Sequence, residues 1–273
     1  MEFRILHFYP DLMNLYGSYA NVSVLVRLLE RMGHTVTVET VSPMDGETTS
    51  EETASGKMAS GKTASGGPAT SKSGTTPPDL SHADFLYMGA GTERRQRFAM
   101  RDFARYGEAV KAAAGDGLPM LFAGTAMELL GESVTTAEGE TFAGVGLAGF
   151  TTVQGRRRIV GDVYGHSALF SQPLVGFMNK CGVIHGVETP LCESLDLGFG
   201  NEAEKGPEGF RQGNVLASEL TGPLLVKNPR LLETVAAAML TRRGAAPASS
   251  FPLDEWAEKG YAVTQQALQA RTE

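Results

Sequence analysis

The first 41 residues alternate a strand, a helix and a strand with very short connections, and this pattern limits the fold more than any other feature. Residues 3–8 form an apolar run typical of a buried strand, and apolar residues recur at helical spacing over 21–32. Gly33 is placed to end that helix, and residues 35–41 are β-branched and alternate. A strand, helix and strand this close together predict a βαβ unit and therefore a parallel sheet.

The same alternation continues after residue 83. It predicts strands at 84–88 and 119–123, helices at 98–114 and 228–240, a short helix from 127, and strand and turn signals over 145–165 and 174–188. Pro229 suits the first position of the last helix. The sequence therefore predicts an α/β fold with three layers, built on a doubly wound and mostly parallel sheet.

The segment 44–82 interrupts this pattern. It consists mainly of Ser, Thr, Gly, Ala, Lys and Pro, and such a segment cannot bury enough apolar surface to offset the entropy lost on ordering. We expect a disordered, low-complexity insertion there, a single domain formed by 1–43 and 83–243, and a C-terminal extension with a short helix over 244–273.

An imperfect five-residue repeat inside the insertion creates a match to the phosphate-loop pattern. Residues 56–63 read GKMASGKT, which fits G-x-x-x-x-G-K-T. That motif works when a buried strand precedes it and a helix follows, so that backbone N–H groups surround the phosphates. Neither context is present, and we interpret the match as a product of the repeat.

Composition excludes some classes of function. The chain has 273 residues, of which 42% are hydrophobic, enough for one large or two small cores. Its net charge of -7 and pI near 5.4 do not suit a nucleic-acid-binding protein, which needs a basic face. The run Arg156-Arg157-Arg158 is the local exception, and we expect it to be a solvated turn at a strand edge.

Cysteine content and hydropathy bear on the compartment. The two cysteines, Cys181 and Cys192, are too few for a disulfide framework and lack metal-ligand spacing. The N-terminus lacks the pattern of a secretory signal, and no run approaches the roughly 20 apolar residues of a membrane span. We expect a cytoplasmic protein without membrane insertion, metal or cofactor.

Four motifs together resemble one family. They are YPDLMNLYG at 9–17 with Asn21, Met88–Gly91, Leu129–Gly131, and GPLLVKNP at 222–229. They resemble the cobyric-acid-synthase-like class I glutamine amidotransferases, and within them the glutaminase subunits of lipid II isoglutaminyl synthase. The likeness covers 1–42 and 83 to about 240, and it implies a flavodoxin-like α/β domain.

The resemblance also implies where catalytic residues should stand. In that family a cysteine on a sharp turn after a strand attacks the glutamine amide, and a histidine acts as its base. Alignment on Leu129–Gly131 places the cysteine position at Gly124, and alignment on GPLL places the histidine position at Thr221. Neither residue can perform the chemistry.

Other candidates for the nucleophile are weaker. Thr125 could present a hydroxyl, but the base position is empty, and we expect its side chain to cap the following helix. Cys181 and His185 invite a pairing, but on a strand they would lie roughly 13 Å apart. We expect a partly buried thiol and a surface histidine, and ordinary surface or satisfied positions for the remaining histidines.

Parts of a binding site could survive these losses. Gly89 and Gly91 match the glycine turn of the family on the oxyanion side, although Ala90 replaces a middle glycine, and a tight turn explains both glycines nearly as well. Arg158 falls where the family has an arginine that we associate with substrate handling.

Three functions remain open at this point. The first is a non-catalytic amidotransferase-like subunit that forms a heterodimer with a Mur-ligase-like partner in cell-wall precursor amidation. The second is an active glutaminase with an unrecognised nucleophile, and the third is a module that binds glutamine or a related small molecule as a sensor.

Overall fold

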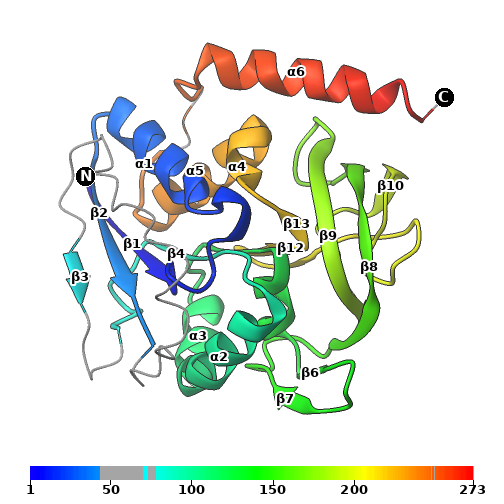
Figure 1. Cartoon of the computed structure of the whole chain (residues 1–273). Coiled ribbons are helices and arrows are strands. Elements are labelled where there is room, and N and C mark those ends of the chain that lie inside the picture. The colour runs from blue at the N-terminus through cyan, green and yellow to red at the C-terminus, as the bar shows by residue number, and fades with distance from the viewer. Residues whose placement is uncertain (44–69, 73–77, 247, 249, 273) are drawn as a thin grey trace, which may run out of the picture.

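A seven-stranded sheet forms the centre of the protein in a computed structural model, which describes residues 1–43, 70–72, 78–246, 248 and 250–272 (Figure 1). The strands are β1 (Glu2–Phe8), β2 (Thr35–Val41), β3 (Thr70–Lys72), β4 (Phe85–Met88), β5 (Met120–Ala123), β11 (Phe210–Gln212) and β12 (Val215–Ser218). Their order is β11-β12-β5-β4-β1-β2-β3, and every pairing except β11 with β12 is parallel. The predicted mostly parallel sheet is confirmed.

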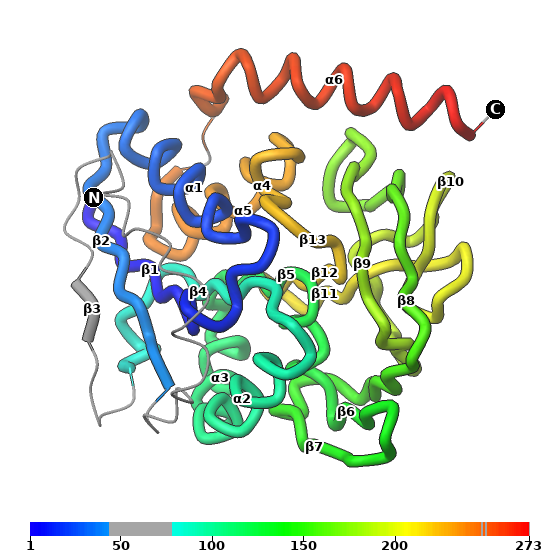
Figure 2. Tube along the Cα trace, in the orientation of Figure 1, coloured from blue at the N-terminus to red at the C-terminus, as the bar shows by residue number. Residues whose placement is uncertain are grey.

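Helices cover both faces of this sheet, as Figures 1 and 2 show. One face packs against α1 (Ala20–Arg31) and α5 (Pro229–Arg242), and the opposite face packs against α2 (Glu93–Phe103) and α3 (Gly107–Gly115). Successive strand residues point to opposite faces, so β1 supplies Phe3 and Ile5 to one core and Leu6 and Phe8 to the other. The result is the predicted three-layer α/β fold.

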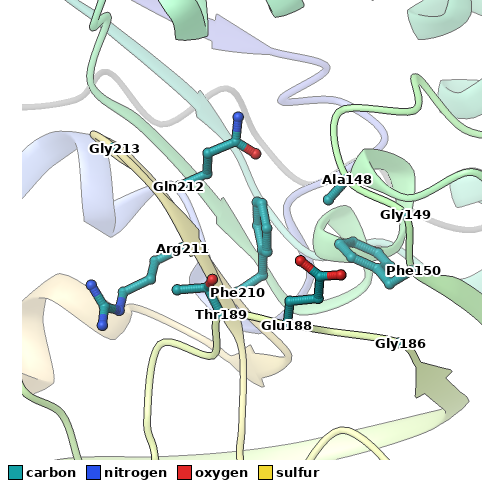
Figure 3. Close-up of a pocket in the computed structure, with 10 residues that line it drawn as sticks. All are labelled: Ala148, Gly149, Phe150, Gly186, Glu188, Thr189, Phe210, Arg211, Gln212 and Gly213. Atoms are coloured by element: carbon teal, nitrogen blue, oxygen red, sulfur yellow. The ribbon is translucent and has the colours of Figure 1, made fainter.

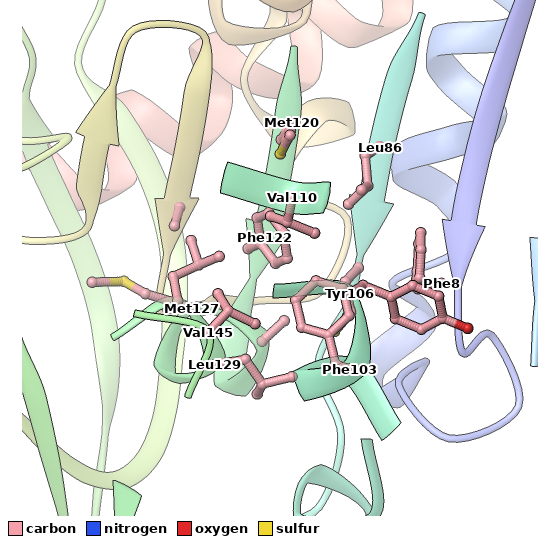
Figure 4. Close-up of a cluster of buried hydrophobic side chains, with 14 of the residues drawn as sticks. Phe8, Leu86, Phe103, Tyr106, Val110, Met120, Phe122, Met127, Leu129 and Val145 are labelled. Carbon is pink, nitrogen blue, oxygen red and sulfur yellow. The ribbon is translucent and has the colours of Figure 1, made fainter. Parts of the chain in front are cut away.

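Figure 4 shows the core between the sheet and helices α2 and α3. Phe8 and Phe103 are fully buried, and their rings meet edge to face with centroids 5.4 Å apart. Burial of each such side chain contributes roughly 1.5–3 kcal/mol to folding. This core fixes the ends of β4 and β5 that precede the glycine turns.

The helix predicted over 98–114 is wrong in its limits. Helix α2 begins at Glu93, where the Thr92 side chain accepts a hydrogen bond from Arg95 N, and it ends at Phe103. A 3₁₀ turn, η2 (Ala104–Tyr106), then leads into α3. The start is difficult to see in the sequence because the inward-facing residue of the first turns, Gln96, is polar and buried.

The segment 44–82 is only partly described. Backbone of β3 pairs in parallel with β2, so a strand stands inside the range predicted to be disordered. Residues 44–69 and 73–77 lie outside the described residues, and with them the phosphate-loop match at 56–63. For these two ranges disorder stays a prediction.

A second sheet stands beside the first. It contains β13 (Leu220–Thr221), β9 (Leu174–His185), β8 (Thr151–His166), β6 (Ser133–Thr135) and β7 (Thr141–Ala143) in that order, and β10 (Ser194–Leu197) pairs with β8. Strands β8 and β9 form a long antiparallel hairpin. The short elements η1 (Leu15–Gly17), η3 (Gly124–Leu130) and α4 (Leu224–Lys227) lie near the junction of the two sheets.

The C-terminal extension carries α6 (Glu255–Gln269), which runs across the helices of the first sheet to the ends of β8 and β9 (Figure 1). Tyr261 and Leu268 are its buried residues, and they pack with Tyr164 and Val175 of the second sheet. Among the described residues, no helix has the length and apolar character needed to cross a membrane.

Candidate functional site

The carboxyl ends of β4 and β5 meet at one edge of the central sheet. The glycine turn Gly89–Gly91 follows β4, and Gly124 follows β5, because the two strands are parallel neighbours in register from Leu86 with Met120. Ligands of open α/β sheets bind outside the carboxyl ends of the strands. These ends, with β13 beside them, form the candidate site.

Gly124 occupies a sharp turn between β5 and η3. Its φ is +61°, in the left-handed region that favours glycine. A Cβ added at Gly124 would lie 2.6 Å from Ala90 Cβ and 3.7 Å from Thr221 Cγ2. The three positions that the resemblance singled out therefore lie together, and the Ala90 methyl group fills the space into which a side chain at Gly124 would project.

The hydroxyl groups of Thr125 and Thr221, near this turn, both form hydrogen bonds to backbone atoms. Thr221 Oγ1 donates to the carbonyl oxygen of Phe177 on β9 at 3.0 Å. Thr125 Oγ1 accepts from Gly91 N at 2.9 Å and donates to Gly91 O at 3.0 Å. The prediction that Thr125 caps the following helix is wrong, since its side chain joins η3 to the glycine turn instead.

A cavity of about 150 Å³ opens beside the turn. It is lined by Leu15, Tyr16, Ala90, Gly91, Thr92, Glu93, Thr125, Arg158, Asn179 and Thr221. It is smaller than the roughly 300–1,000 Å³ of typical ligand pockets. Gly91, Arg158 and Thr221, three of the residues singled out by sequence, thus share one cavity.

Gly89 does not line the cavity. A Cβ there would lie 2.5 Å from Ser18 Oγ and 2.6 Å from Met13 O, so close approach of the 13–18 loop accounts for this glycine. A Cβ at Gly91 would lie 2.4 Å from Met13 Sδ. Packing therefore explains both glycines, and a binding role for them stays a prediction.

Arg158 connects the polar residues that line one side of the cavity. Its Nε donates to Asn179 Oδ1 at 2.6 Å, its Nη1 lies 2.7 Å from Glu93 Oε1, and its Nη2 donates to Asn179 O at 3.0 Å. Asn179 Nδ2 in turn donates to Tyr16 OH at 2.7 Å. Residues from β8, β9, α2 and η1 are joined in this way around one guanidinium group.

Cys181 lies at the edge of this network but is not poised as a nucleophile. Its Sγ is 3.4 Å from Glu93 Oε1, and burial together with the Glu93 charge raises the pKa of the thiol to about 12. His185 is exposed, with Nδ1 3.6 Å from Glu202 Oε1. The structure thus gives each of these two residues an acidic neighbour of its own.

A buried charged cluster lies behind the site, and sequence reasoning missed it. Lys180 is almost fully buried, and its Nζ contacts Glu219 Oε2 and the carbonyl oxygens of Gly200 and Asn201. Glu208 accepts hydrogen bonds from Ser218 Oγ and Glu219 N. Burial raises the pKa of Glu208 to about 7 and also raises the pKa of Glu219. The sequence did hold a sign of this cluster, because Lys180 stands at a position of β9 whose alternation predicts a buried side chain.

Glu128 of η3 is a further buried carboxyl group in this region. Its Oε2 accepts from Gln96 Nε2 at 2.8 Å and from Gln154 Nε2 at 3.0 Å. Burial raises its pKa. Among the described residues, no group of three or more His, Cys, Asp or Glu side chains is placed to hold a metal ion.

A second cavity of about 490 Å³ lies away from the glycine turns, next to edge strand β11 (Figure 3). Phe150 and Phe210 meet edge to face there, with ring centroids 5.5 Å apart, and the Arg211 side chain points away from them. Arg211 Nη2 already pairs with Glu193 at 3.3 Å. This larger cavity contains none of the positions marked by the sequence.

Comparison with known proteins identifies the family of the chain. Residues 66–229 match the model of the CobB/CobQ-like glutamine amidotransferase domain. The chain belongs to this family. The family predicted from the four motifs is thereby confirmed.

Two curated relatives carry the same name, lipid II isoglutaminyl synthase (glutamine-hydrolyzing) subunit GatD. The protein from Staphylococcus aureus strain N315 is 26% identical over 244 residues, covering 89% of this chain and 86% of the relative. The protein from Streptococcus pneumoniae R6 is 27% identical over 246 residues, covering 89% and 82%.

Solved structures of glutamine amidotransferases are also similar. One from Thermotoga maritima is 12% identical, with a TM-score of 0.43 and coverage of 98% of this chain and 95% of that chain. Another glutamine amidotransferase is 14% identical, with a TM-score of 0.47 and coverage of 88% and 99%.

Proposed function

We propose that this amidotransferase-family chain is a non-catalytic subunit of a complex that amidates a cell-wall precursor. It would form a cytoplasmic heterodimer with a Mur-ligase-like protein and support that partner without supplying ammonia. The role in cell-wall amidation is supported by the similarity to the two GatD subunits over most of the chain.

The observation that carries the proposed inactivity is the closed turn at Gly124. A glutaminase of this family needs a thiolate at the turn and a base beside it. Here the turn has no side chain, the Ala90 methyl group lies where that side chain would be, and Thr221 presents a methyl group toward it. Thr221 Oγ1 cannot act as the base, because a hydroxyl group does not take up a proton at neutral pH.

Nearby groups offer no replacement for the missing pair. The Thr125 hydroxyl is engaged on both sides by the backbone of Gly91. The raised pKa of Cys181 leaves its sulfur as a thiol at neutral pH, and the thiolate is the reactive form. Both observations support inactivity over an unrecognised nucleophile.

The test is glutamate release from glutamine by the purified chain, alone and with a Mur-ligase-like protein of the same organism. The expected result is no release above the rate of a buffer blank in either case. Cys181→Ala and Cys192→Ala serve as matched variants, since both cysteines are buried. Release that disappears only in the Cys181→Ala variant would show an active glutaminase and overturn the proposal.

Association with the ligase is tested separately by size-exclusion chromatography of the mixed proteins. A joint peak with equal amounts of both chains is expected whether or not glutamine is hydrolysed. Separate elution at concentrations well above the micromolar range would contradict the proposed heterodimer.

The polar groups around Arg158 favour a second candidate function, a module that binds glutamine or a related amino acid without turnover. A guanidinium group in a cavity is suited to a carboxylate ligand. Calorimetric titration with glutamine and glutamate tests this reading, which predicts saturable heat that is lost in an Arg158→Gln variant. Absence of heat with both ligands would exclude it.

A further inference from the structure

The arginine triplet 156–158 lies in an irregular part of β8. The antiparallel register with β9 shifts between Gln154 and Ile159, and all three arginines are exposed. Arg158 turns back toward the cavity and pairs with Glu93, the first residue of α2. The salt bridge therefore places the triplet next to the first turns of α2.

Helix α2 adds a further arginine to this surface. Arg97 follows Glu93 by four residues, and residues four apart are neighbours on one helix face. We name the group Arg97, Arg156, Arg157 and Arg158 the arginine surface. Glu93, which lies between Arg97 and Arg158, is paired with Arg158.

Arginines elsewhere in the described chain commonly have a carboxylate partner, as in Arg4 with Glu39 and Arg243 with Asp84. Arg97, Arg156 and Arg157 differ, because they make no hydrogen bond or ion pair with another described residue. In a chain with a net charge of -7, acidic partners are plentiful. Arg158 is the member of the group that lines the cavity, whereas Arg156 and Arg157 precede it on β8 and Arg97 lies on α2. Guanidinium groups without a carboxylate partner favour an anionic ligand.

Exposed apolar side chains lie beside the arginine surface. Val160, 51% exposed, is the register partner of Asn179, which lines the cavity. Tyr16, 44% exposed, is hydrogen-bonded to Asn179, and Tyr19, 50% exposed, follows three residues later. In a lipid headgroup layer, guanidinium groups can bind the anionic phosphates, while neighbouring valine and tyrosine side chains can contact the apolar boundary below them.

We propose that the arginine surface with Tyr16, Tyr19 and Val160 binds the phosphate groups of a lipid headgroup. In this arrangement the chain is held at the surface of an anionic bilayer. This contact goes beyond the proposed function and is independent of glutamine hydrolysis, so a glutamate-release result neither supports nor overturns it.

The experiment is co-sedimentation of the full chain with vesicles of phosphatidylcholine, with and without phosphatidylglycerol. Binding is expected only when phosphatidylglycerol is present, and it should weaken as salt rises. The double variant Arg156→Gln, Arg157→Gln should bind about 30-fold more weakly, which corresponds to about 2 kcal/mol at about 1 kcal/mol per arginine. Equal binding to both kinds of vesicle, or none to either, would overturn the proposal.

Three controls separate the position of the charge, the kind of cation and the source of the phosphate. Arg27→Gln with Lys259→Gln removes the same charge from α1 and α6 and should leave vesicle binding unchanged, whereas Arg156→Lys with Arg157→Lys should restore most of it. Sodium pyrophosphate in calorimetry represents a soluble phosphate ligand. Saturable pyrophosphate binding without vesicle binding would assign the surface to a soluble anion and contradict the lipid assignment.

Discussion

The centre and the rim of the candidate site differ in chemistry although they belong to one cavity. At the centre, Gly124 has no side chain and faces the methyl groups of Ala90 and Thr221. At the rim, Arg158 keeps hydrogen bonds to Asn179 and a salt bridge to Glu93. The position that the resemblance assigns to the catalytic cysteine is apolar and closed, whereas the rim is polar. This difference is the basis of the proposal that the chain is a non-catalytic subunit.

The largest expected effect lies at the centre. Gly124→Ala should lower the free energy of unfolding by roughly 2–5 kcal/mol, because it adds left-handed backbone strain of roughly 1–2 kcal/mol and overpacking of roughly 1–3 kcal/mol against Ala90. Urea unfolding measures this loss in the free energy of unfolding. Adding Ala90→Gly should recover the overpacking part and leave the strain.

Gly33→Ala is the matched control for this prediction. Gly33 also has a positive φ, +81°, but an added Cβ would meet no atom within 4 Å. It should therefore show the strain alone. If Gly124→Ala costs no more than Gly33→Ala, the centre is not closed by Ala90, and the contrast with the rim fails.

The buried carboxyl groups behind the centre predict a pH dependence. Burial raises the pKa of Glu208 to about 7, above the usual value of 4.5. A raised folded-state pKa means stability that is full below the unfolded pKa and is lost as pH rises through about 7. The free energy of unfolding should be lower at pH 8.5 than at pH 6.5, by about 0.8 kcal/mol from Glu208.

Glu208→Gln checks the origin of this dependence, because an amide does not titrate. The variant should show a smaller difference between the two pH values than the unchanged chain. Stability that is equal or higher at pH 8.5 in the unchanged chain would contradict a protonated carboxyl group behind the site.

The smallest effect is expected at the rim. The Arg158 and Glu93 side chains are 43% and 27% exposed, and such surface ion pairs contribute about 0–1 kcal/mol. Arg158→Gln should therefore change the free energy of unfolding by less than about 1 kcal/mol, as measured beside Arg27→Gln. A loss of unfolding free energy comparable to that of Gly124→Ala would show that Arg158 is a structural residue, and the contrast between the centre and the rim would fail.

Much of the fold was predictable because local patterns determine it. The strands 3–8, 35–41, 84–88 and 119–123 are mostly apolar or rich in β-branched residues, and Pro229 marks the start of α5. The start of α2 was missed because Gln96 is buried through hydrogen bonds to Thr125 and Glu128, a long-range pairing that apolar periodicity does not record. Local pattern thus fails where a polar group is buried.

The proximity of the residues singled out by the resemblance is observed, whereas their role stays a prediction. Resemblance placed Gly124, Thr221 and Arg158, and the structure brings them to one cavity edge. Two contacts depend on residues more than 30 positions apart, about which spacing in the sequence says nothing. They are the position of the Ala90 methyl group, 2.6 Å from where a Cβ on Gly124 would lie, and the hydrogen bonds of Thr125 Oγ1 to Gly91.

Covalent labelling with a glutamine-mimicking diazoketone, followed by intact-mass spectrometry, tests the lost nucleophile most directly. The reagent reports a reactive thiolate at a glutamine site even when turnover is slow. The chain should keep its unmodified mass at neutral pH under conditions that fully label a GatD subunit with an active thiol. An adduct of one reagent per chain, lost in the Cys181→Ala variant or mapped to the turn at Gly124, would contradict the account.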